Sequence, residues 1–421
     1  HLHDATALDD WFSLRTAWQS LVGGDGPELK PKFFFTRIAG LRACPEGQEL
    51  EPLLGAPFQA LKSFLNNIRK ESDDLNSARD FVRHWWSESS EPMKDASLFL
   101  CGEPVWLCPI IHELAQRPML LRFNMAILDE FTYHNGQTSP ALDEWWISLR
   151  KFVDSGGATH TSVGTRYTVE QVAYQTKQAV RFPYVPFLGL SMPPRSTHPV
   201  QPRSRTLLFQ TNLPPILTFK RVLKSFAAAY SEVELVDMND LDRTVCRPEM
   251  GAYESAILIP HNPAPIRLID LYAQGVVMYV PGEPLIHKWV WANRPFGGFD
   301  GMPVYRAVSS LDFPKTWSVE PPERHPPFSF MAGLANWAIS QHTEDRRYWL
   351  QYTEWEQLPA LQRFAGIPDL LEQLSTRSLE DVVRIRSEMS LQLEARRASA
   401  LSWWRGAISG TYLHPSSPLV R

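Results

Sequence analysis

Short apolar runs alternate with amphipathic segments through the middle of the chain, a pattern that is typical of an α/β protein. Between residues 97 and 190, four runs rich in apolar residues are predicted strands: SLFLCGE, PMLLRFNM, ATHTSV and FPYVPFLGL. Segments 105–116, 142–153 and 168–179 place apolar residues at helical spacing and are predicted helices. Alternating strands and helices with short connections predict parallel strands with right-handed crossovers, and therefore a doubly wound sheet.

A proline-rich break separates this series from a second one. Segment 193–205 holds four prolines and three arginines with almost no apolar residue, and it is a predicted linker. After it, the apolar runs TLLFQT and VELVDM resume the alternation. The expected domains are therefore 1–192 and 206–320. Segment 321–421 is predicted to be helical, and its five tryptophans favour packing back on the first domain.

Composition limits the classes of function. The chain has 421 residues and a formal net charge of -4, so no nucleic-acid partner is expected, because phosphate binding would leave a basic excess. No apolar run approaches the roughly 18 residues that a membrane-spanning helix needs, so no transmembrane segment is expected. The four cysteines show no CxxC spacing, which disfavours a zinc site and leaves open whether they are paired.

One stretch, 255–281, holds a complete strand, turn, helix and second strand. SAILIP is a predicted buried strand, and the prolines of the following HNPAP turn end it because proline supplies no ladder donor. A helix is predicted over 266–274, closed by Gly275 in the left-handed conformation of a helix cap. The run VVMYVP then predicts the next buried strand.

This stretch resembles the donor half of nucleotide-sugar glycosyltransferases of the GT-B architecture. The family pattern is an acid, then small or apolar residues, a glycine and a strand; Asp270 stands where the family usually has Glu, and Val277 stands where many members have Pro. The resemblance implies two Rossmann-like domains facing a cleft, with the first on the acceptor side and the second binding the donor. It implies that Asp270 accepts hydrogen bonds from a nucleotide ribose and that the N-terminus of its helix faces the diphosphate.

The resemblance also implies the partners. The substrates would be a nucleotide sugar, such as a UDP-sugar or GDP-sugar, and a carbohydrate, glycoprotein or glycolipid acceptor, with no cofactor and no metal in the site. A Golgi or secretory-lumen location is expected if an N-terminal anchor has been removed, and a cytoplasmic one otherwise.

Transfer requires that the leaving nucleoside diphosphate be neutralised. Candidate donor-binding residues stand at predicted strand ends and along the predicted helix: Thr211, Asn212, His261, Arg267, Asp270 and Gly275. Instead of binding phosphate, Arg267 could be a solvated residue of the first helical turn. Instead of a site residue, His261 could be a structural histidine. We expect Asp270 at the edge of the cleft, where its replacement would leave the melting temperature almost unchanged.

An inverting reaction also needs a general base on the acceptor side. Glu103, at the end of a predicted strand, is the candidate, because active sites gather at the carboxyl edges of parallel sheets. Its alternative is an acid that merely favours a helix N-terminus. Weaker candidates for the base are Asp129, Glu130 and His160. Two other functions stay open: a catalytically inactive GT-B-like binding or scaffold protein, and a nucleotide-sugar epimerase.

Overall fold

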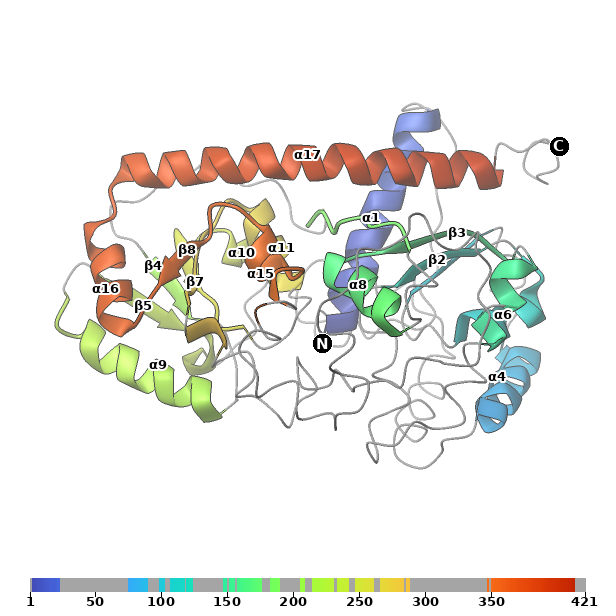
Figure 1. Ribbon diagram of the computed structural model, residues 1–421, viewed down its shortest axis with the longest axis horizontal. Helices are drawn as coiled ribbons and strands as arrows, with labels where there is room; N and C mark the ends of the chain where they lie inside the picture. Colours follow the sequence, from blue (N-terminus) through green and yellow to red (C-terminus); the bar gives the residue numbers. More distant parts are fainter. Residues whose placement is uncertain are drawn as a thin grey trace. The chain divides into compact units, whose positions relative to one another are not determined.

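The protein is described here from a computed structural model (Figure 1). The structure describes residues 2–22, 75–89, 98–102, 107–117, 119–123, 147–149, 151–155, 157–175, 182–189, 205–208, 214–230, 233–241, 247–260, 266–283, 285–287, 347 and 350–412. None of the described helices is both long and apolar enough to span a membrane.

The chain divides into two compact units. Unit 1 comprises His1–Pro186, Met302–Ile339 and Ser399–Arg421, and unit 2 comprises Phe187–Gly301 and Ser340–Ala398. The division after Pro186 falls a few residues before the predicted linker 193–205, of which only Arg205 lies within the described residues.

Unit 1 contains a parallel sheet in the order β1-β2-β3. Its described elements are α1 (Leu2–Val22), α4 (Leu75–Ser89), β1 (Phe99–Cys101), α6 (Leu107–Ala115), β2 (Met119–Phe123), β3 (Ala158–Val163) and α8 (Arg166–Gln175). The three strands lie in the apolar runs from which they are predicted. The fourth predicted strand, FPYVPFLGL, instead forms an isolated bridge between Tyr184 and Val163. Pro183 and Pro186 explain the difference, because neither can donate to a ladder.

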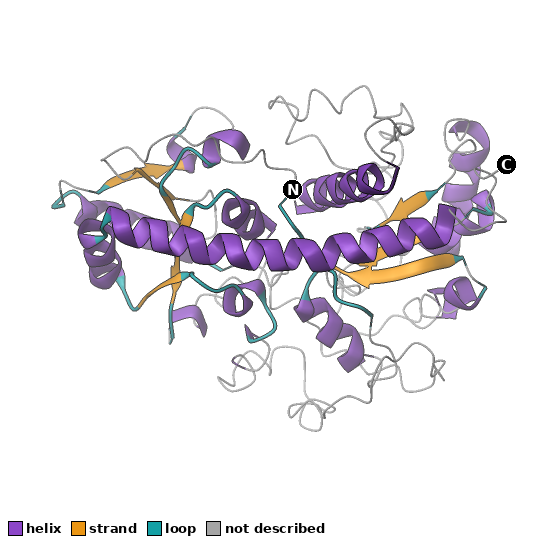
Figure 2. Cartoon of the chain, turned by 90° about the horizontal axis from the view of Figure 1, so that it is seen from above, coloured by secondary structure: helices purple, strands orange, loops and turns teal. Residues whose placement is uncertain are grey.

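Helix α17 (Leu379–Tyr412) contributes to both units and is drawn as one uninterrupted helix in Figure 2. From Ser399 onward it packs within unit 1, where Trp404 is fully buried. The guanidinium of Arg122 on β2 lies 5.7 Å from the centre of the Trp404 ring and forms a buried ion pair with Asp10 of α1. A buried charge needs such a partner, so this cluster joins β2, α1 and the end of α17.

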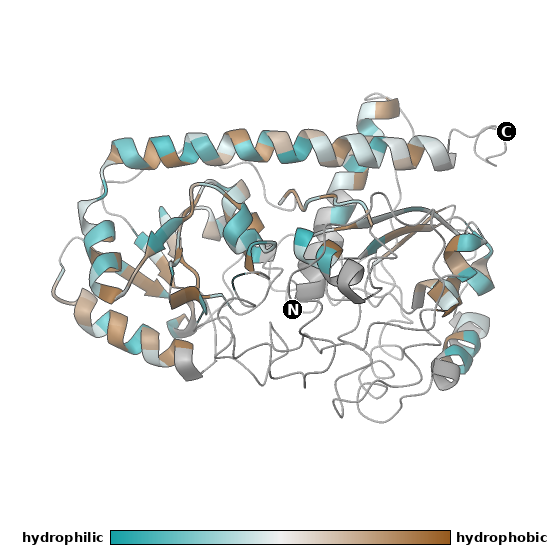
Figure 3. Cartoon of the chain, viewed as in Figure 1, coloured by the Kyte–Doolittle hydropathy of each residue, from teal (hydrophilic) through white to brown (hydrophobic). Residues whose placement is uncertain are grey.

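Unit 2 contains a five-stranded parallel sheet in the order β5-β4-β6-β7-β8. Its described elements are β4 (Arg205–Leu208), α9 (Pro214–Ala227), β5 (Glu234–Asp237), a short 3-10 turn (Met238–Asp240), α10 (Arg247–Met250), β6 (Ser255–Ile257), α11 (Ile266–Ala273), β7 (Val277–Pro281), α15 (Glu354–Gln357), β8 (Gln362–Phe364), α16 (Ile367–Thr376) and the first part of α17. Figure 3 shows both hydrophobic and hydrophilic residues in the strands of this sheet. All five residues of β7 are buried, as expected for a central parallel strand.

Strand β8 departs from the prediction of a purely helical C-terminal segment. It pairs with β7 through the registers Tyr279↔Gln362 and Pro281↔Phe364. The sequence QRF is short and mostly polar, so it carries no strand periodicity. Tertiary pairing with an apolar neighbour, rather than local propensity, makes it a strand.

Helices pack on both faces of this sheet (Figure 1). Helix α16 contacts α9 on one side, where the rings of Phe219 and Phe364 stack with 6.0 Å between their centres. On the other side, Arg386 of α17 bonds to Gly275 at the end of α11. Helix α17 begins with a capping box, since Asp381 accepts a bond from the Ser378 N–H (3.2 Å) and donates its own N–H to Ser378 Oγ (3.1 Å).

Candidate functional site

Strands β4 and β6 end together at one edge of the unit 2 sheet, with Leu208 in register with Ile257. The chain leaves β4 through α9 toward β5, and leaves β6 through α11 toward β7, so the two connections depart in opposite directions along the sheet. Open parallel sheets bind ligands outside the carboxyl ends of strands where the order reverses in this way. The carboxyl edge of β4 and β6 is therefore the candidate ligand-binding edge.

Helix α11 follows β6 at this edge and is embedded in unit 2. Leu268, Ile269, Leu271 and Tyr272 are each no more than 2% exposed. The helix ends in a Schellman motif, in which the Val276 N–H donates to Leu271 O (3.1 Å) and the Gly275 N–H to Tyr272 O (3.0 Å).

Three of the predicted donor-binding residues lie in or next to α11. Gly275 has a φ of +65°, which confirms the predicted left-handed cap. Its carbonyl accepts a bond from Arg386 Nε at 3.0 Å. At about 1.5 Å per residue, Gly275 lies roughly 13 Å along the helix axis from Ile266. Arg267 lies in the first turn and is exposed to solvent. Arg267 therefore lies at the N-terminal end of α11, which follows the candidate edge, whereas Gly275 lies at the opposite end of the helix.

Asp270 does not lie at an exposed cleft edge, so that expectation is wrong. Its exposed fraction is 2%, and the neighbouring chain approaches it closely, since a Cβ on Gly189 would lie 3.5 Å from Asp270 Cα. The side chain is enclosed within unit 2, and its replacement must therefore affect folding stability as well as any ligand.

The remaining candidates fall into two groups. Glu103, Thr211, Asn212 and His261, together with the alternatives Asp129 and Glu130, lie outside the described residues. His160 lies on β3 in unit 1, where its ring meets Trp403 edge to face at 6.3 Å, and burial lowers its pKa. A Cβ on Gly410 would approach His160 Cε1 to 2.9 Å. His160 is thus a packing residue beneath α17.

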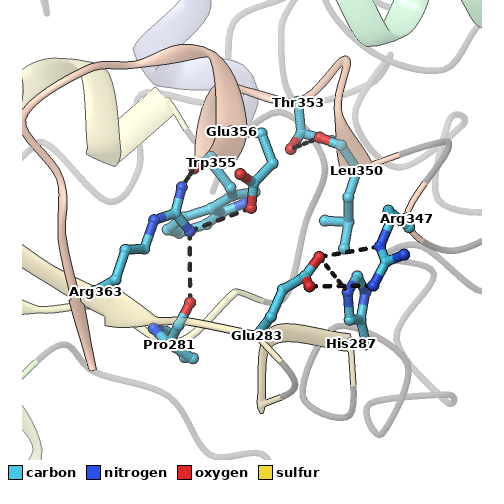
Figure 4. A network of polar contacts seen from close by, with 9 residues as sticks. All are labelled: Pro281, Glu283, His287, Arg347, Leu350, Thr353, Trp355, Glu356 and Arg363. Carbon is cyan, nitrogen blue, oxygen red and sulfur yellow. Dashed lines mark hydrogen bonds and ion pairs between the residues drawn. The ribbon is translucent and has the colours of Figure 1, made fainter. Parts of the chain in front are cut away.

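A polar network that sequence reasoning missed lies just beyond the carboxyl end of β7 (Figure 4). Glu283 is its centre: His287 Nε2 lies 3.1 Å from Oε1, and Arg347 donates to both carboxylate oxygens at 3.1 Å. Hydrogen bonds from His287 and Arg347 hold the pKa of Glu283 below its ordinary value. The spacing of Glu283 and His287 is a readable helical signal, but Arg347 is 64 residues away and has no sequence cue.

Glu356 and Arg363 form the second half of this network. Arg363 Nη1 lies 3.2 Å from Glu356 Oε1 and donates to Pro281 O at 3.4 Å, and its other terminal nitrogen donates to Trp355 O. Burial raises the pKa of Glu356, an effect that the charge of Arg363 opposes. The pKa values of Glu283 and Glu356 are therefore shifted in opposite directions, although each carboxylate is paired with an arginine.

A separate charged cluster lies at the carboxyl end of β5, the outer strand on the other side of the sheet. Asp237, the last residue of β5, is buried and accepts bonds from Lys220 and Lys224, each at 2.8 Å. Lys224 also pairs with Asp240 at 2.7 Å. Because two lysines already neutralise it, Asp237 is poorly suited to accept hydrogen bonds from a sugar diol. Within the described part of the chain, no three His, Cys, Asp or Glu side chains gather in a way that could hold a metal ion.

Comparison with known proteins gives no family for this chain. No protein-family model matches it, and no curated protein matches it. What the structure supplies is an α/β fold with parallel sheets and a candidate ligand-binding edge, together with a disulfide between Cys101 and Cys108 that joins the end of β1 to the start of α6.

Proposed function

We propose that this protein is a glycosyltransferase that moves a sugar from a nucleotide-sugar donor to a carbohydrate, glycoprotein or glycolipid acceptor, with two Rossmann-like domains of the GT-B type. The observation that carries the proposal is the strand order of unit 2. Counted along the chain from β4, the order is 2-1-3-4-5, one of the two common doubly wound orders, and its reversal falls between β4 and β6.

Two of the chain segments that carry candidate donor residues follow the two strands that flank this reversal. Thr211 and Asn212 follow β4 in the chain, and His261 follows β6. Because Leu208 and Ile257 are in register, both segments start from the same edge of neighbouring strands. Residues that approach a ligand from two neighbouring strands are what nucleotide recognition at such an edge requires.

The diphosphate would be bound at the start of α11. A helix N-terminus presents free N–H groups and a positive dipole end, and the exposed guanidinium of Arg267 adds a full charge in its first turn. These groups would stabilise the leaving diphosphate by charge and hydrogen bonding, a task that needs no metal ion. Glu103 remains the proposed general base.

The proposal rests on Arg267 and does not rest on Asp270. The family resemblance assigns it to the ribose, but its carboxylate is buried. The phosphate contact of Arg267 therefore carries the proposal, and the contribution of Asp270 to nucleotide affinity is a separate question.

The disulfide bears on location. Disulfides persist in oxidising compartments and are rare in the cytosol, so the Cys101–Cys108 bond favours the secretory lumen over the cytoplasm. Mass spectrometry of the peptide that contains both cysteines, from protein alkylated before reduction, tests this directly. Full alkylation of both thiols in the protein from its native source would contradict the lumenal location.

The test of the function is nucleotide binding followed by turnover. Calorimetry with UDP and GDP should detect binding of at least one nucleotide, and Arg267→Ala should weaken it by about tenfold or more, since charge-assisted hydrogen bonds contribute roughly 1.5 to 3 kcal/mol. The matched control is Arg221→Ala, which removes an exposed arginine from α9. Equal nucleotide affinity in Arg267→Ala, Arg221→Ala and the wild type would contradict a phosphate-binding role for Arg267.

One second candidate is a GT-B-like protein that binds without catalysing transfer, because His160, the candidate base that lies within the described residues, packs beneath α17. Hydrolysis of a panel of nucleotide sugars separates the two, because an inactive binding protein would retain affinity for a nucleotide and release no free sugar. Product analysis would reveal an epimerase by conversion of one nucleotide sugar into another.

A further inference from the structure

Helix α11 and its C-terminal cap are contacted by three segments that are far from them in sequence. On one side, Gly189 packs so tightly that a Cβ there would lie 2.6 Å from Ala273 Cβ and 3.0 Å from Ile269 O. On a second side, Tyr272 donates its hydroxyl to Pro359 O at 3.3 Å. These contacts restrict translation of the helix across the sheet.

The third contact comes from α17 and acts at the helix end. Arg386 Nε donates to Gly275 O at 3.0 Å. Gly275 closes the Schellman motif, so its carbonyl orientation is tied to the last turn of α11 through two backbone hydrogen bonds. A charged donor on this carbonyl also suits the negative end of the helix dipole. Arg386 therefore ties the C-terminal end of α11 to α17.

The restraint is built into the fold of unit 2. Val382, Ile385 and Met389 of α17 are each no more than 2% exposed, so this part of the helix is anchored by burial on either side of Arg386. Arg384 lies two residues away on the same helix, but its side chain is 59% exposed and it pairs only locally with Asp381 and Glu388 among the described contacts. The two arginines share a helix and a charge but differ in what they touch.

We infer that Arg386 is a positioning residue for nucleotide binding: it holds α11 so that the N–H groups of its first turn and Arg267 stand ready for a diphosphate. This inference rests on the proposed function. A binding group must be held to within a fraction of an ångström to act without an ordering cost, and α11 carries that group at one end and the Arg386 contact at the other.

The experiment compares Arg386→Met with Arg384→Met and measures the Kd of UDP and GDP well below the melting temperature. Arg386→Met should weaken binding about three- to tenfold, as expected for the loss of one hydrogen bond that preorganises the site, while Arg384→Met should bind as the wild type does. Arg386→Lys, which keeps the charge, should recover part of the loss. Unchanged affinity in folded Arg386→Met would show that the residue only supports stability and would overturn the inference.

Hydrogen exchange without nucleotide separates this inference from the proposed function. The amides of α11 should exchange about three- to tenfold faster in Arg386→Met than in Arg384→Met, because the helix has lost its end restraint. Equal protection of α11 in the two variants would overturn the positioning role even if the wild type binds nucleotides. A wild type that binds neither UDP nor GDP would overturn the proposed function and, with it, the nucleotide part of the inference.

Discussion

Arg396 of α17 and Glu354 of α15 form a buried bidentate ion pair. Nη1 lies 2.8 Å from Oε2 and Nη2 lies 2.9 Å from Oε1, with both side chains no more than 7% exposed. The fork of the guanidinium matches the carboxylate, so each charge is compensated in an environment where an isolated charge is very costly. The pair joins α17 to the segment that leads into β8.

Breaking this pair should destabilise unit 2 strongly. Arg396→Met leaves the Glu354 carboxylate buried without its partner, and loss of one member of a buried pair costs roughly 3 to 5 kcal/mol. Denaturant unfolding monitored by tryptophan fluorescence measures the loss. The double variant Arg396→Met with Glu354→Leu should lose less than the sum of the two single changes. A loss under about 1 kcal/mol in the single variant would show that the pair contributes little.

Asp270→Ala should lower the melting temperature, and under the ribose role that the family resemblance implies it should lower nucleotide affinity as well. Removal of a buried polar group costs roughly 1 to 3 kcal/mol, in contrast to the nearly unchanged stability expected of an exposed residue. Asp240→Ala is the control, since its side chain is 68% exposed and such surface pairs contribute about 1 kcal/mol or less. Calorimetry and thermal unfolding separate the two effects. A melting temperature equal to that of the wild type would contradict the burial of this carboxylate.

Two glutamates of the network beyond β7 should show opposite dependence of stability on pH. The pKa of Glu283 is lowered in the folded protein by His287 and Arg347, so its contribution is present above the ordinary glutamate pKa and is lost as the pH falls through the lowered value. The difference in melting temperature between the wild type and Glu283→Gln should therefore shrink on acidification below about pH 4.5. The change should be small because the side chain is 55% exposed.

Glu356 is the matched comparison. Burial raises its pKa, so its favourable contribution is present below the ordinary pKa and is lost as the pH rises through the raised value. Glu356→Gln should consequently gain stability relative to the wild type as the pH rises above about 4.5. Thermal unfolding of the three proteins across this range is the measurement. Parallel curves of melting temperature against pH for Glu283→Gln and Glu356→Gln would contradict the opposite pKa shifts of the two glutamates.

Two glycines near the end of α17 should respond differently to alanine. At Gly406 a Cβ meets nothing within 4 Å, so Gly406→Ala should stabilise the helix by roughly 0.5 to 1 kcal/mol through propensity alone. At Gly410 the new Cβ would lie 2.9 Å from His160 Cε1, and relief of that overlap would force the imidazole or the helix to move. Gly410→Ala should therefore be less stable than Gly406→Ala in thermal unfolding, and the opposite order would contradict the packing of His160 beneath α17.

The local pattern of residues was sufficient to predict much of unit 2. The runs SAILIP and VVMYVP are β-branched and apolar, and they become β6 and β7 because a strand covered on both faces requires such side chains. Gly275 is the left-handed cap of α11 because glycine adopts a positive φ without a steric penalty. These features depend on neighbours within a few residues, which is why the sequence alone is informative about them.

Tertiary structure decided what depends on distant partners. The polar tripeptide QRF became β8 only by pairing with β7, and Asp270 was enclosed by a close approach of Gly189, 81 positions earlier in the chain. The network around Glu283 likewise assembles around an arginine 64 residues away. The sequence by itself determined the α/β class, the central strands and the ends of α11, because these follow from periodicity and backbone sterics. Strand order, burial of charges and the restraint on α11 follow from packing between segments, which no local pattern encodes.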